Sequence, residues 1–279
     1  LYVKGDWQAC FDQPGVGVIG SRMCSTYGVN ASEMLSRDLA SRGITVVSGL
    51  ARGIDTAAHR GAIAGKGKTI GVIGTGIDTV YPRENNGLVR EILESGGCIV
   101  SQFPLGTPPL AENFPYRNRI ISGLSLGVLI VEASERSGSL ITARLAMEQN
   151  REVMAVPGNI PSGNSFGTNY LIKSGAKLVQ QWQDVVAELP SEIAAAILPP
   201  KIEKAKAEDA VRQPELTPAD MTYNERKIWS ILNPDEPVHI DILLEQSGLS
   251  FGDLNTALVS LDIRDLIRVL PGKHYARRI

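Results

Sequence analysis

The sequence predicts an α/β protein built on a doubly wound, mostly parallel sheet and followed by a smaller second domain. Short apolar runs alternate with helix-like stretches over residues 1–190. Most of these runs lack strict polar alternation, which is typical of parallel strands buried on both faces. After residue 190 the composition changes to Ala, Pro, Lys and Glu, which indicates a linker.

The candidate strands are short runs rich in Val and Ile. They cover Gly15–Ile19, Ile44–Val47, Thr69–Ile73, Cys98–Val100, Val128–Val131, Val153–Val156 and Lys177–Val179. The helix-like stretches between them are Ala31–Ser41, Thr56–Ala64, Gly87–Leu93, Tyr116–Leu124, Leu140–Gln149 and Tyr170–Lys173. Ligands of doubly wound sheets bind beyond the carboxyl ends of the strands, so we expect the site in the loops that follow the strands.

The stretch 114–125 organises the predicted site. Pro115 fits the first turn of a helix, and the apolar residues that follow are spaced to give one buried face. This leaves Phe114, Arg117 and Asn118 at the start of the helix, where the helix dipole is positive. Guanidinium, amide and aromatic groups there suit an anionic partner with flat faces, such as a nucleic acid strand. The alternative is an ordinary amphipathic helix with solvated arginines.

Loops rich in Gly, Ser and Arg follow the predicted strands. They are Gly20–Arg22, Ser48–Asp55, Gly74–Asn85, Glu132–Ser139 and Pro157–Asn159, and the loop after the fourth strand leads into Phe114–Arg119. Glycines let backbone N–H groups approach an anion, and a helix start such as Ser139–Thr142 adds its dipole. Because these loops share one edge of the sheet, they predict a continuous binding rim.

A dinucleotide fold is the obvious competing assignment, because Gly15–Gly20 formally matches G-x-G-x-x-G. Two of these glycines lie within the predicted strand, whereas the fingerprint requires its glycines in the turn after the strand. Ser48 also stands where a ribose-binding carboxylate is needed. The sequence contains no P-loop motif either, so we expect no nucleotide cofactor.

Net charge excludes a broad electrostatic interface. The chain carries a net charge of −2, and residues 1–190 hold 17 Lys+Arg against 16 Asp+Glu. Any nucleic acid site is therefore a local pocket of arginines and backbone amides. No apolar run approaches membrane-spanning length, and three isolated cysteines without a CxxC pair favour a reducing cytoplasm over a zinc site or a disulfide framework.

Six spaced motifs together resemble the DNA-processing protein A (DprA or Smf) family. They are Gly20-Ser21-Arg22, Ser48-Gly49-x-Ala51-x-Gly53-Ile54-Asp55, Gly76-x-Asp78-x-x-Tyr81-Pro82, Phe114-Pro115-x-Arg117-Asn118-Arg119-Ile120-Ile121-Ser122-Gly123, Glu132-Ala133-x-x-x-Ser137-Gly138-Ser139-x-x-Thr142-Ala143 and Val156-Pro157-Gly158. The resemblance implies an extended Rossmann-like domain that binds single-stranded DNA, forms a homodimer and loads the RecA recombinase during natural transformation, with no cofactor and no enzymatic activity. Family members often carry an additional small N-terminal domain. Since this chain begins at Leu1, we expect it to be part of a longer protein.

The resemblance also implies roles for single residues. Arg22 matches a DNA-contacting arginine, and Arg83 stands where related sequences often have lysine. Phe114 offers a face for base stacking. The arginines at 117 and 119 contact phosphate or pair with a nearby glutamate. The full candidate set is Ser21, Arg22, Ser48, Gly49, Arg52, Arg83, Phe114, Arg117, Asn118, Arg119, Ser137, Gly138, Ser139, Thr142 and Lys173.

Several polar residues have a structural interpretation beside the functional one. Asp55 and Asp78 are expected to cap helices or brace loops. Asp55 and His59 share one helix face, a spacing that suits acid–base chemistry but more often makes a local pair. For Arg52 both a DNA contact and an internal carboxylate partner remain open.

A linker over residues 191–221 and a winged-helix domain over residues 222–279 follow the first domain of residues 1–190. The last domain is predicted from three helices and a two-stranded hairpin around Pro271-Gly272-Lys273. Its third helix carries Asp253 and Asp262 without an intervening Lys or Arg, which suits a DNA groove poorly. We therefore expect protein contacts or regulation, with nucleic acid contacts by Lys273, Arg277 and Arg278 as the alternative.

Two rival functions remain. Nucleotide-processing phosphoribohydrolases of related Rossmann-like fold have a Pro-Gly-Gly-x-Gly-Thr run, whereas this chain has only Pro157-Gly158-Asn159. The other rival is an adaptor whose sheet edge binds protein. Assays for released base and for oligonucleotide binding separate the three functions.

Overall fold

A computed structural model describes residues 1–198, 221–232, 238–264, 266–270 and 272–277. The chain divides into two compact units, Leu1–Ile202 and Glu203–Ile279. Each unit has its own hydrophobic core and is described by itself. None of the helices in these residues is long and apolar enough to cross a bilayer.

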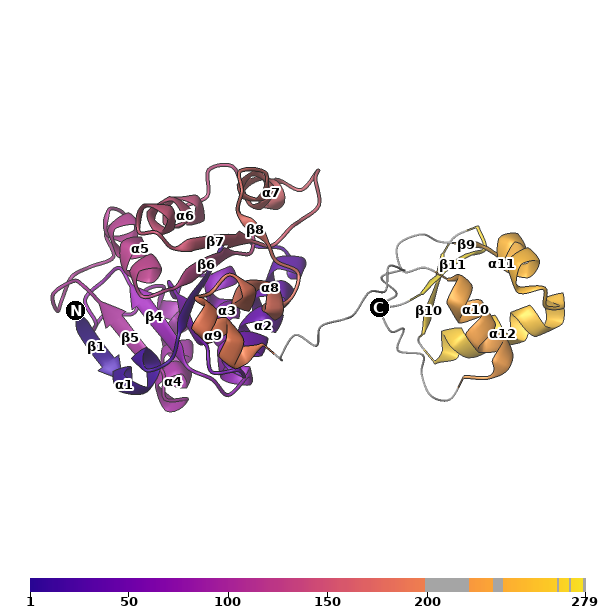
Figure 1. Cartoon of the computed structure of the whole chain (residues 1–279), viewed down its shortest axis with the longest axis horizontal. Coiled ribbons are helices and arrows are strands. Elements are labelled where there is room, and N and C mark those ends of the chain that lie inside the picture. Colours follow the sequence, from indigo (N-terminus) through magenta and orange to yellow (C-terminus); the bar gives the residue numbers. More distant parts are fainter. Residues whose placement is uncertain (199–220, 233–237, 265, 271, 278–279) are drawn as a thin grey trace. The chain divides into compact units, whose positions relative to one another are not determined.

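The first unit is built on an eight-stranded sheet with the order β1-β5-β4-β3-β2-β6-β7-β8 (Figure 1). Its strands are β1 (Tyr2–Gly5), β2 (Gly15–Ile19), β3 (Thr45–Ser48), β4 (Thr69–Ile73), β5 (Cys98–Ser101), β6 (Gly127–Ile130), β7 (Glu152–Ala155) and β8 (Lys177–Leu178). β1 pairs antiparallel with β5, and the other neighbouring strands are parallel. The predicted doubly wound, mostly parallel sheet is confirmed.

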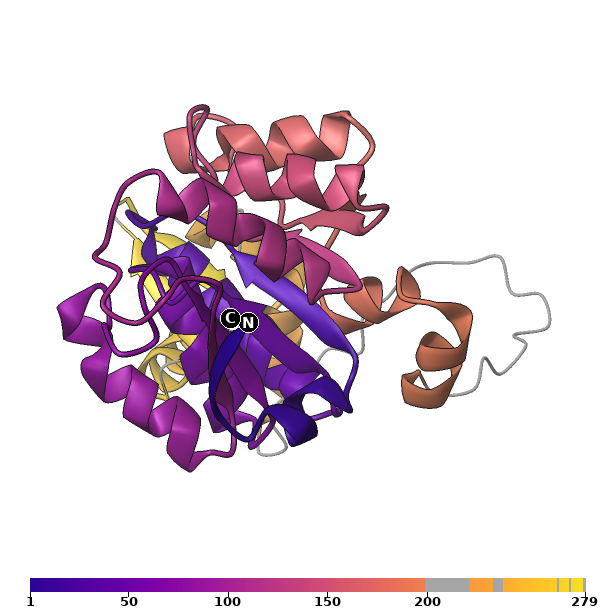
Figure 2. The same cartoon turned by 90° about the vertical axis from the view of Figure 1, so that its left-hand side faces the viewer.

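Helices cover both faces of this sheet (Figure 1 and Figure 2). One face carries α2 (Thr26–Ala40), α3 (Ile54–Ala64), α4 (Asn86–Glu94), α8 (Trp182–Ala187) and α9 (Ser191–Ile197). The opposite face carries α1 (Trp7–Phe11), α5 (Asn113–Gly123), α6 (Ser139–Glu148) and α7 (Phe166–Lys173). Two short 3-10 helices, η1 (Arg83–Asn85) and η2 (Gly163–Ser165), lie in the loops before α4 and α7.

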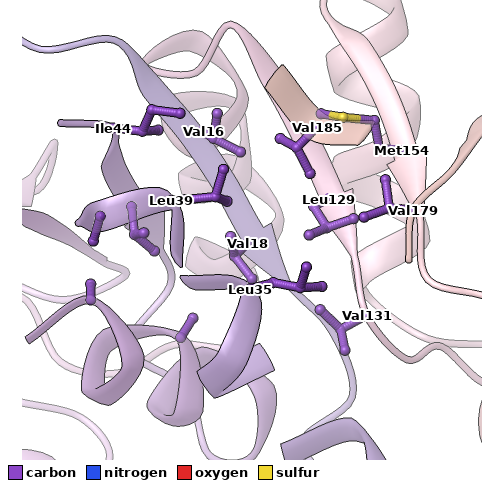
Figure 3. Packing of buried hydrophobic residues seen from close by; sticks show 14 of the residues in the cluster. Val16, Val18, Leu35, Leu39, Ile44, Leu129, Val131, Met154, Val179 and Val185 are labelled. Carbon is purple, nitrogen blue, oxygen red and sulfur yellow. The ribbon is translucent and has the colours of Figure 1, made fainter. Parts of the chain in front are cut away.

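The larger core lies between α2, α3 and α8 and the central strands. Figure 3 shows Leu35 and Leu39 of α2 near Val16 and Val18 of β2, with Val185 of α8 near the neighbouring strands β6 and β7. These five side chains are at most 1% exposed. All five residues of β2 are buried, as expected of a strand covered on both faces.

The glycines of β2 explain why the apparent dinucleotide motif lies in the strand. A Cβ atom at Gly15 would lie 2.5 Å from the carbonyl oxygen of Leu124, and one at Gly17 would lie 3.1 Å from Ser125 Oγ. Both contacts come from the end of α5. These glycines therefore permit a close approach of helix and strand, and neither lies in the turn after the strand.

The seven predicted strands are all present, with boundaries displaced by at most one residue. The sequence pattern does not predict β1 or the helices α1 and α8. β1 is an exposed edge strand of four residues, so it lacks the apolar pattern of the buried strands. α2 begins five residues before the predicted helix Ala31–Ser41, because Gly28 and Asn30 are poor helix formers and hide its first turns in the sequence. Ser25 caps the helix, since its Oγ accepts from the Gly28 N–H at 3.1 Å.

The second unit has the element order of a winged helix. It contains α10 (Tyr223–Ile231), β9 (Val238–His239), α11 (Ile240–Ser247), α12 (Phe251–Ile263), β10 (Ile267–Leu270) and β11 (His274–Arg277). The three strands form a sheet with the order β10-β11-β9, of which β9 was not predicted. The hydrophobic core of the second unit includes Ile228, Leu254 and Leu261. Within the predicted linker, α9 packs its Ile193 and Ile197 on the core of the first unit, whereas residues 199–220 and Arg278 lie outside the described residues.

Candidate functional site

The strand order places the candidate site at a topological switch point. The chain proceeds from β2 through β3 and β4 to β5 on one side, and then returns through α5 to β6 on the other side of β2. Where the loops after two adjacent strands run in opposite directions, a crevice opens between them at the carboxyl ends of these strands. Here the crevice lies between the loop after β2 and the loop after β6.

A pocket of about 550 Å³ opens at this crevice. Nine of the predicted site residues line it: Ser21, Arg22, Phe114, Arg117, Asn118, Ser137, Gly138, Ser139 and Thr142. They come from the β2 loop, the start of α5, and the loop and first turn of α6. The fold thus brings together side chains that lie more than 100 positions apart in the sequence, such as Ser21 and Thr142.

Phe114 is the aromatic centre of the pocket. The Arg22 guanidinium carbon lies 5.6 Å from the centre of its ring, and that of Arg117 lies 5.8 Å away. The Tyr81 ring centre is at 5.6 Å with an interplanar angle of 47°. Behind the ring, a Cβ atom at Gly74 would lie only 3.0 Å from Phe114 Cδ1. The ring is therefore held in place and half-buried, with two cations beside it.

Arg117 is buried, which the sequence analysis did not predict. Its side chain donates to the carbonyl oxygen of Gly49 at 2.5 Å and to that of Val72, and its Nε donates to Asn118 Oδ1 at 3.2 Å. Burial lowers the pKa of Arg117 to about 10, an effect that nearby Asp55 opposes, so the group stays charged at neutral pH. Arg117 therefore ties α5 to the ends of β3 and β4 and supplies positive charge to the pocket wall.

Asp55 lies on the same wall of the pocket as Arg117. Its carboxylate accepts from the Ala51 N–H at 3.2 Å and so braces the loop after β3. Burial raises the pKa of Asp55, and the charge of Arg117 opposes this effect. A Cβ atom at Gly49 would lie 2.6 Å from Asp55 Oδ2 and 2.8 Å from Arg117 Nη1, so only glycine fits between these two side chains.

His59 lies buried on α3 and does not pair with Asp55. Its Nδ1 is 2.7 Å from Thr69 Oγ1, and the Thr69 hydroxyl donates to the Val46 carbonyl at 2.8 Å. Because the one hydroxyl proton is used for that bond, the His59 Nδ1–H is the donor to Thr69. Nε2 is then an unprotonated nitrogen, and it is buried without a hydrogen-bond partner among the described residues.

The protonation of His59 makes the stability of the fold acid-sensitive. Burial and then the nearby Arg117 lower its pKa to about 3, whereas an unfolded histidine titrates near 6.5. Between these values the unfolded state binds the extra proton, so the free energy of unfolding falls as pH drops below about 6.5. We expect wild type to lose about 2–3 kcal/mol more than His59→Gln between pH 7 and pH 4.5 in urea denaturation. Parallel losses in the two proteins would contradict this assignment.

The remaining predicted residues lie outside this pocket. Ser48 is buried at the end of β3, where its Oγ donates to the Val18 carbonyl at 2.7 Å, and Gly49 lies beneath Arg117. Arg119 is exposed and donates to Gln102 Oε1 at 2.7 Å. Arg83 and Lys173, in η1 and at the end of α7, are exposed and line neither this pocket nor the smaller one beside it.

Arg52 lines the adjoining smaller pocket together with Arg22, Tyr81 and Phe114. The sequence leaves two partners open for Arg52, DNA and an internal carboxylate, and the structure shows that Arg52 pairs with a carboxylate. Arg52 Nε lies 2.5 Å from Glu84 Oε1, and its Nη2 lies 2.7 Å from Glu84 Oε2, which is a bidentate ion pair. Both side chains are more than half exposed, so the pair is accessible to a competing anion.

Tyr81 and Met23 line the pocket but are not among the predicted site residues. Tyr81 lines both pockets and packs beside Phe114, and Met23 is 85% exposed at the rim. Tyr81 stands in one of the quoted motifs, so its aromatic side chain at the carboxyl edge of the sheet was a usable signal. Met23 follows Arg22 directly, but no pattern in the sequence distinguishes it from a core methionine.

Comparison with known proteins identifies the family. Residues 1–190 match the family model of the DNA recombination-mediator protein A, and residues 212–273 match that of the DprA winged helix domain. Protein Smf of Escherichia coli is 40% identical over 279 residues, which are the whole of this chain and 71% of that protein. The chain belongs to the DprA family.

Two DprA structures resemble about two thirds of this chain. DNA processing protein A from Streptococcus pneumoniae is 47% identical, with a TM-score of 0.63 over 67% of this chain and 65% of that one. DprA from Helicobacter pylori, whose structure is described for its unique single-stranded DNA binding mode, is 32% identical, with a TM-score of 0.61 over 66% of this chain and 83% of that one. The chain thus spans roughly two thirds of the length of the Streptococcus protein.

Proposed function

We propose that this DprA-family chain binds single-stranded DNA in the pocket at the β2–β6 switch point. The observation that carries the proposal is the grouping of the half-buried Phe114 ring with Arg22 and Arg117 at one sheet edge. Arg22 is exposed and supplies a guanidinium fork for a phosphate, while the ring offers a surface on which a base stacks. The single-stranded DNA binding described for the Helicobacter relative supports the same function.

Hydroxyl groups complete the proposed contact to the strand. The hydroxyls of Ser137 and Ser139 lie 2.7 Å apart at the start of α6, and Thr142 lies one turn further on. The amino end of α6 favours negative charge, which suits a phosphate near these hydroxyls. A net charge of −2 provides no broad attraction for a duplex, so recognition depends on this local set.

Preference for a single strand follows from the size and shape of the pocket. A base must leave its stack to reach the Phe114 ring, which is half-buried in a pocket of about 550 Å³. A single strand exposes its bases at low cost, whereas a duplex must first be unpaired. We therefore expect single strands to bind more tightly than duplexes of the same sequence.

Binding of labelled single-stranded and duplex oligonucleotides, measured by fluorescence anisotropy, tests the proposal. Wild type is expected to prefer the single strand. Arg22→Ala is expected to weaken that binding about tenfold and to lower the slope of log affinity against log salt by about 1, because one phosphate contact is lost. Unchanged affinity of Arg22→Ala would refute the assignment of the pocket.

Glu84 limits the contribution of Arg52 in the free protein. The Arg52 side chain holds the pKa of Glu84 below its usual value through their hydrogen bonds, so Glu84 is ionised and competes with phosphate for Arg52. Glu84→Gln is expected to raise single-strand affinity roughly two- to fivefold at low salt, because an exposed ion pair contributes only a small free energy. Glu91→Gln, an exposed change on α4, is the matched control. Equal or weaker binding by Glu84→Gln would contradict a contact between Arg52 and DNA.

The proposed role in the cell is protection of incoming single strands and their delivery to the RecA recombinase during natural transformation, in the cytoplasm and without catalysis.

We also propose a homodimer through the first unit, because β8 is an edge strand whose Leu178 is 39% exposed. Sedimentation equilibrium of the chain tests the dimer. Incubation with nucleoside monophosphates tests the rival hydrolase, and we expect no released base.

A further inference from the structure

Cys10 and Cys98 form a pair of buried thiols outside the DNA pocket. Cys10 lies on α1 and Cys98 begins β5, and both belong to one hydrophobic cluster. The Cys10 thiol lies 3.7 Å from the carbonyl oxygen of Gly96, two residues before Cys98, and the Cys98 side chain lowers the pKa of Cys10. Both side chains are at most 1% exposed.

The backbone holds these two cysteines together. β1 pairs with β5 so that Gly5 stands opposite Cys98, and the Asp6 N–H donates to the Gly97 carbonyl at 3.2 Å. α1 begins directly after these contacts and directs Cys10 back over the start of β5. The Cys10 thiol therefore lies beside the start of β5, where Cys98 is the first residue, although the two cysteines are far apart in the sequence.

Each of the two thiols affects the pKa of the other. The Cys98 side chain lowers the pKa of Cys10, and the Lys68 ammonium group acts in the same direction. The Cys10 side chain, together with burial, raises the pKa of Cys98. Cys10 lies on the five-residue helix α1, so an opening of that helix exposes Cys10 first, and Cys98 at the start of β5 is the thiol that would resolve the mixed disulfide. Burial instead raises the pKa of Cys24, the third cysteine of the chain.

We propose that Cys10 and Cys98 are a redox modification site that forms a reversible intramolecular disulfide with a small-molecule disulfide as oxidant. The Cys10 thiolate attacks one sulfur of the oxidant, breaks its S–S bond and expels one thiolate. The Cys98 thiol then loses its proton and attacks the Cys10 sulfur, which expels the second thiolate. The protein loses two electrons and two protons, and the oxidant is reduced to two thiols.

Access to Cys10 requires only a local opening of α1. This helix has five residues, and its Trp7 and Phe11 side chains are 51% and 41% exposed. Short, exposed segments of this kind open at much lower cost than the whole fold. Once formed, the disulfide would fix α1 and β1 to β5 and restrict the unfolded chain, so it should raise the thermal midpoint of the first unit.

The experiment is oxidation of the chain by oxidised glutathione, followed by alkylation of free thiols, digestion and mass spectrometry. The expected product of wild type is a peptide pair joined through Cys10 and Cys98, with Cys24 alkylated. Cys24→Ser is the matched control and should give the same crosslink. Cys98→Ser should accumulate glutathione on Cys10, because the resolving thiol is missing.

Other outcomes would overturn the proposal. One is glutathione on Cys24 with Cys10 and Cys98 both alkylated, and another is a crosslink that appears only when urea is present. Wild type and Cys24→Ser carry the native pair, so the test stands even if Cys98→Ser fails to fold. Neither cysteine lines the DNA pocket, so failure here would leave single-strand binding untouched.

Discussion

Arg117→Leu is expected to destabilise the first unit by about 3–5 kcal/mol, which is typical when one partner of a buried charged pair is removed. The substitution leaves the carbonyl groups of Gly49 and Val72 without their donor and deprives buried Asp55 of the nearby positive charge. Urea denaturation followed by circular dichroism measures the loss. This effect makes Arg117→Ala or Arg117→Leu unsuitable as a simple test of DNA binding.

Arg119→Leu is the matched control, because Arg119 lies on the same helix but is exposed, and its guanidinium group donates to Gln102 at the surface. We expect Arg119→Leu to change stability by less than about 0.5 kcal/mol. Combining Arg117→Leu with Asp55→Asn should recover part of the loss, since the uncompensated buried charge is removed. Equal effects of the two leucine substitutions would contradict the buried position of Arg117.

Phe114→Ala is expected to weaken single-strand binding by about 1–3 kcal/mol, which corresponds to roughly 5- to 150-fold. The ring is the aromatic surface beside Arg22 and Arg117, so its removal abolishes stacking and leaves the arginines in place. Because salt acts on the phosphate contacts, the slope of affinity against salt should stay near the wild-type value. Fluorescence anisotropy over a series of salt concentrations measures both quantities.

Phe166→Ala serves as the control for loss of a phenylalanine, because Phe166 is 52% exposed on α7 and lines neither pocket. Its affinity should match that of wild type. Phe114→Tyr should retain most of the binding, since an aromatic face remains. If Phe114→Ala bound single strands as tightly as wild type, base stacking at this position would be excluded.

The sequence predicted the sheet well because its central strands are buried on both faces. Short apolar runs such as Gly15–Ile19 are therefore recognised as strands, and the glycines and polar residues around them mark where the strands end. Four-residue β1 was missed, because all its residues are exposed and its pairing with β5 is a tertiary interaction. The position of the switch point between β2 and β6 could not be predicted either, because it depends on the order of the strands in the sheet, and the sequence pattern does not give that order.

At the site, the sequence identified the residue types but not which arginine is buried. Arg117 and Arg119 are two positions apart, and only the position of α5 on the sheet decides between them. A signal was available, because Asn113, Arg117 and Ile121 are spaced four residues apart and are all buried. The ion pair between Arg52 and Glu84 joins two loops across the edge of the sheet, so its geometry could not be derived from spacing.

The most direct measurement of the central claim is ultraviolet crosslinking of a single-stranded oligonucleotide to the chain, followed by mass spectrometric mapping of the attached peptides. Binding at the switch point predicts crosslinks to peptides that contain Tyr81 or Phe114, with loss of these crosslinks in Arg22→Ala at moderate salt. Crosslinks confined to residues 221–277 would place the DNA on the winged-helix unit and contradict the pocket as the binding site.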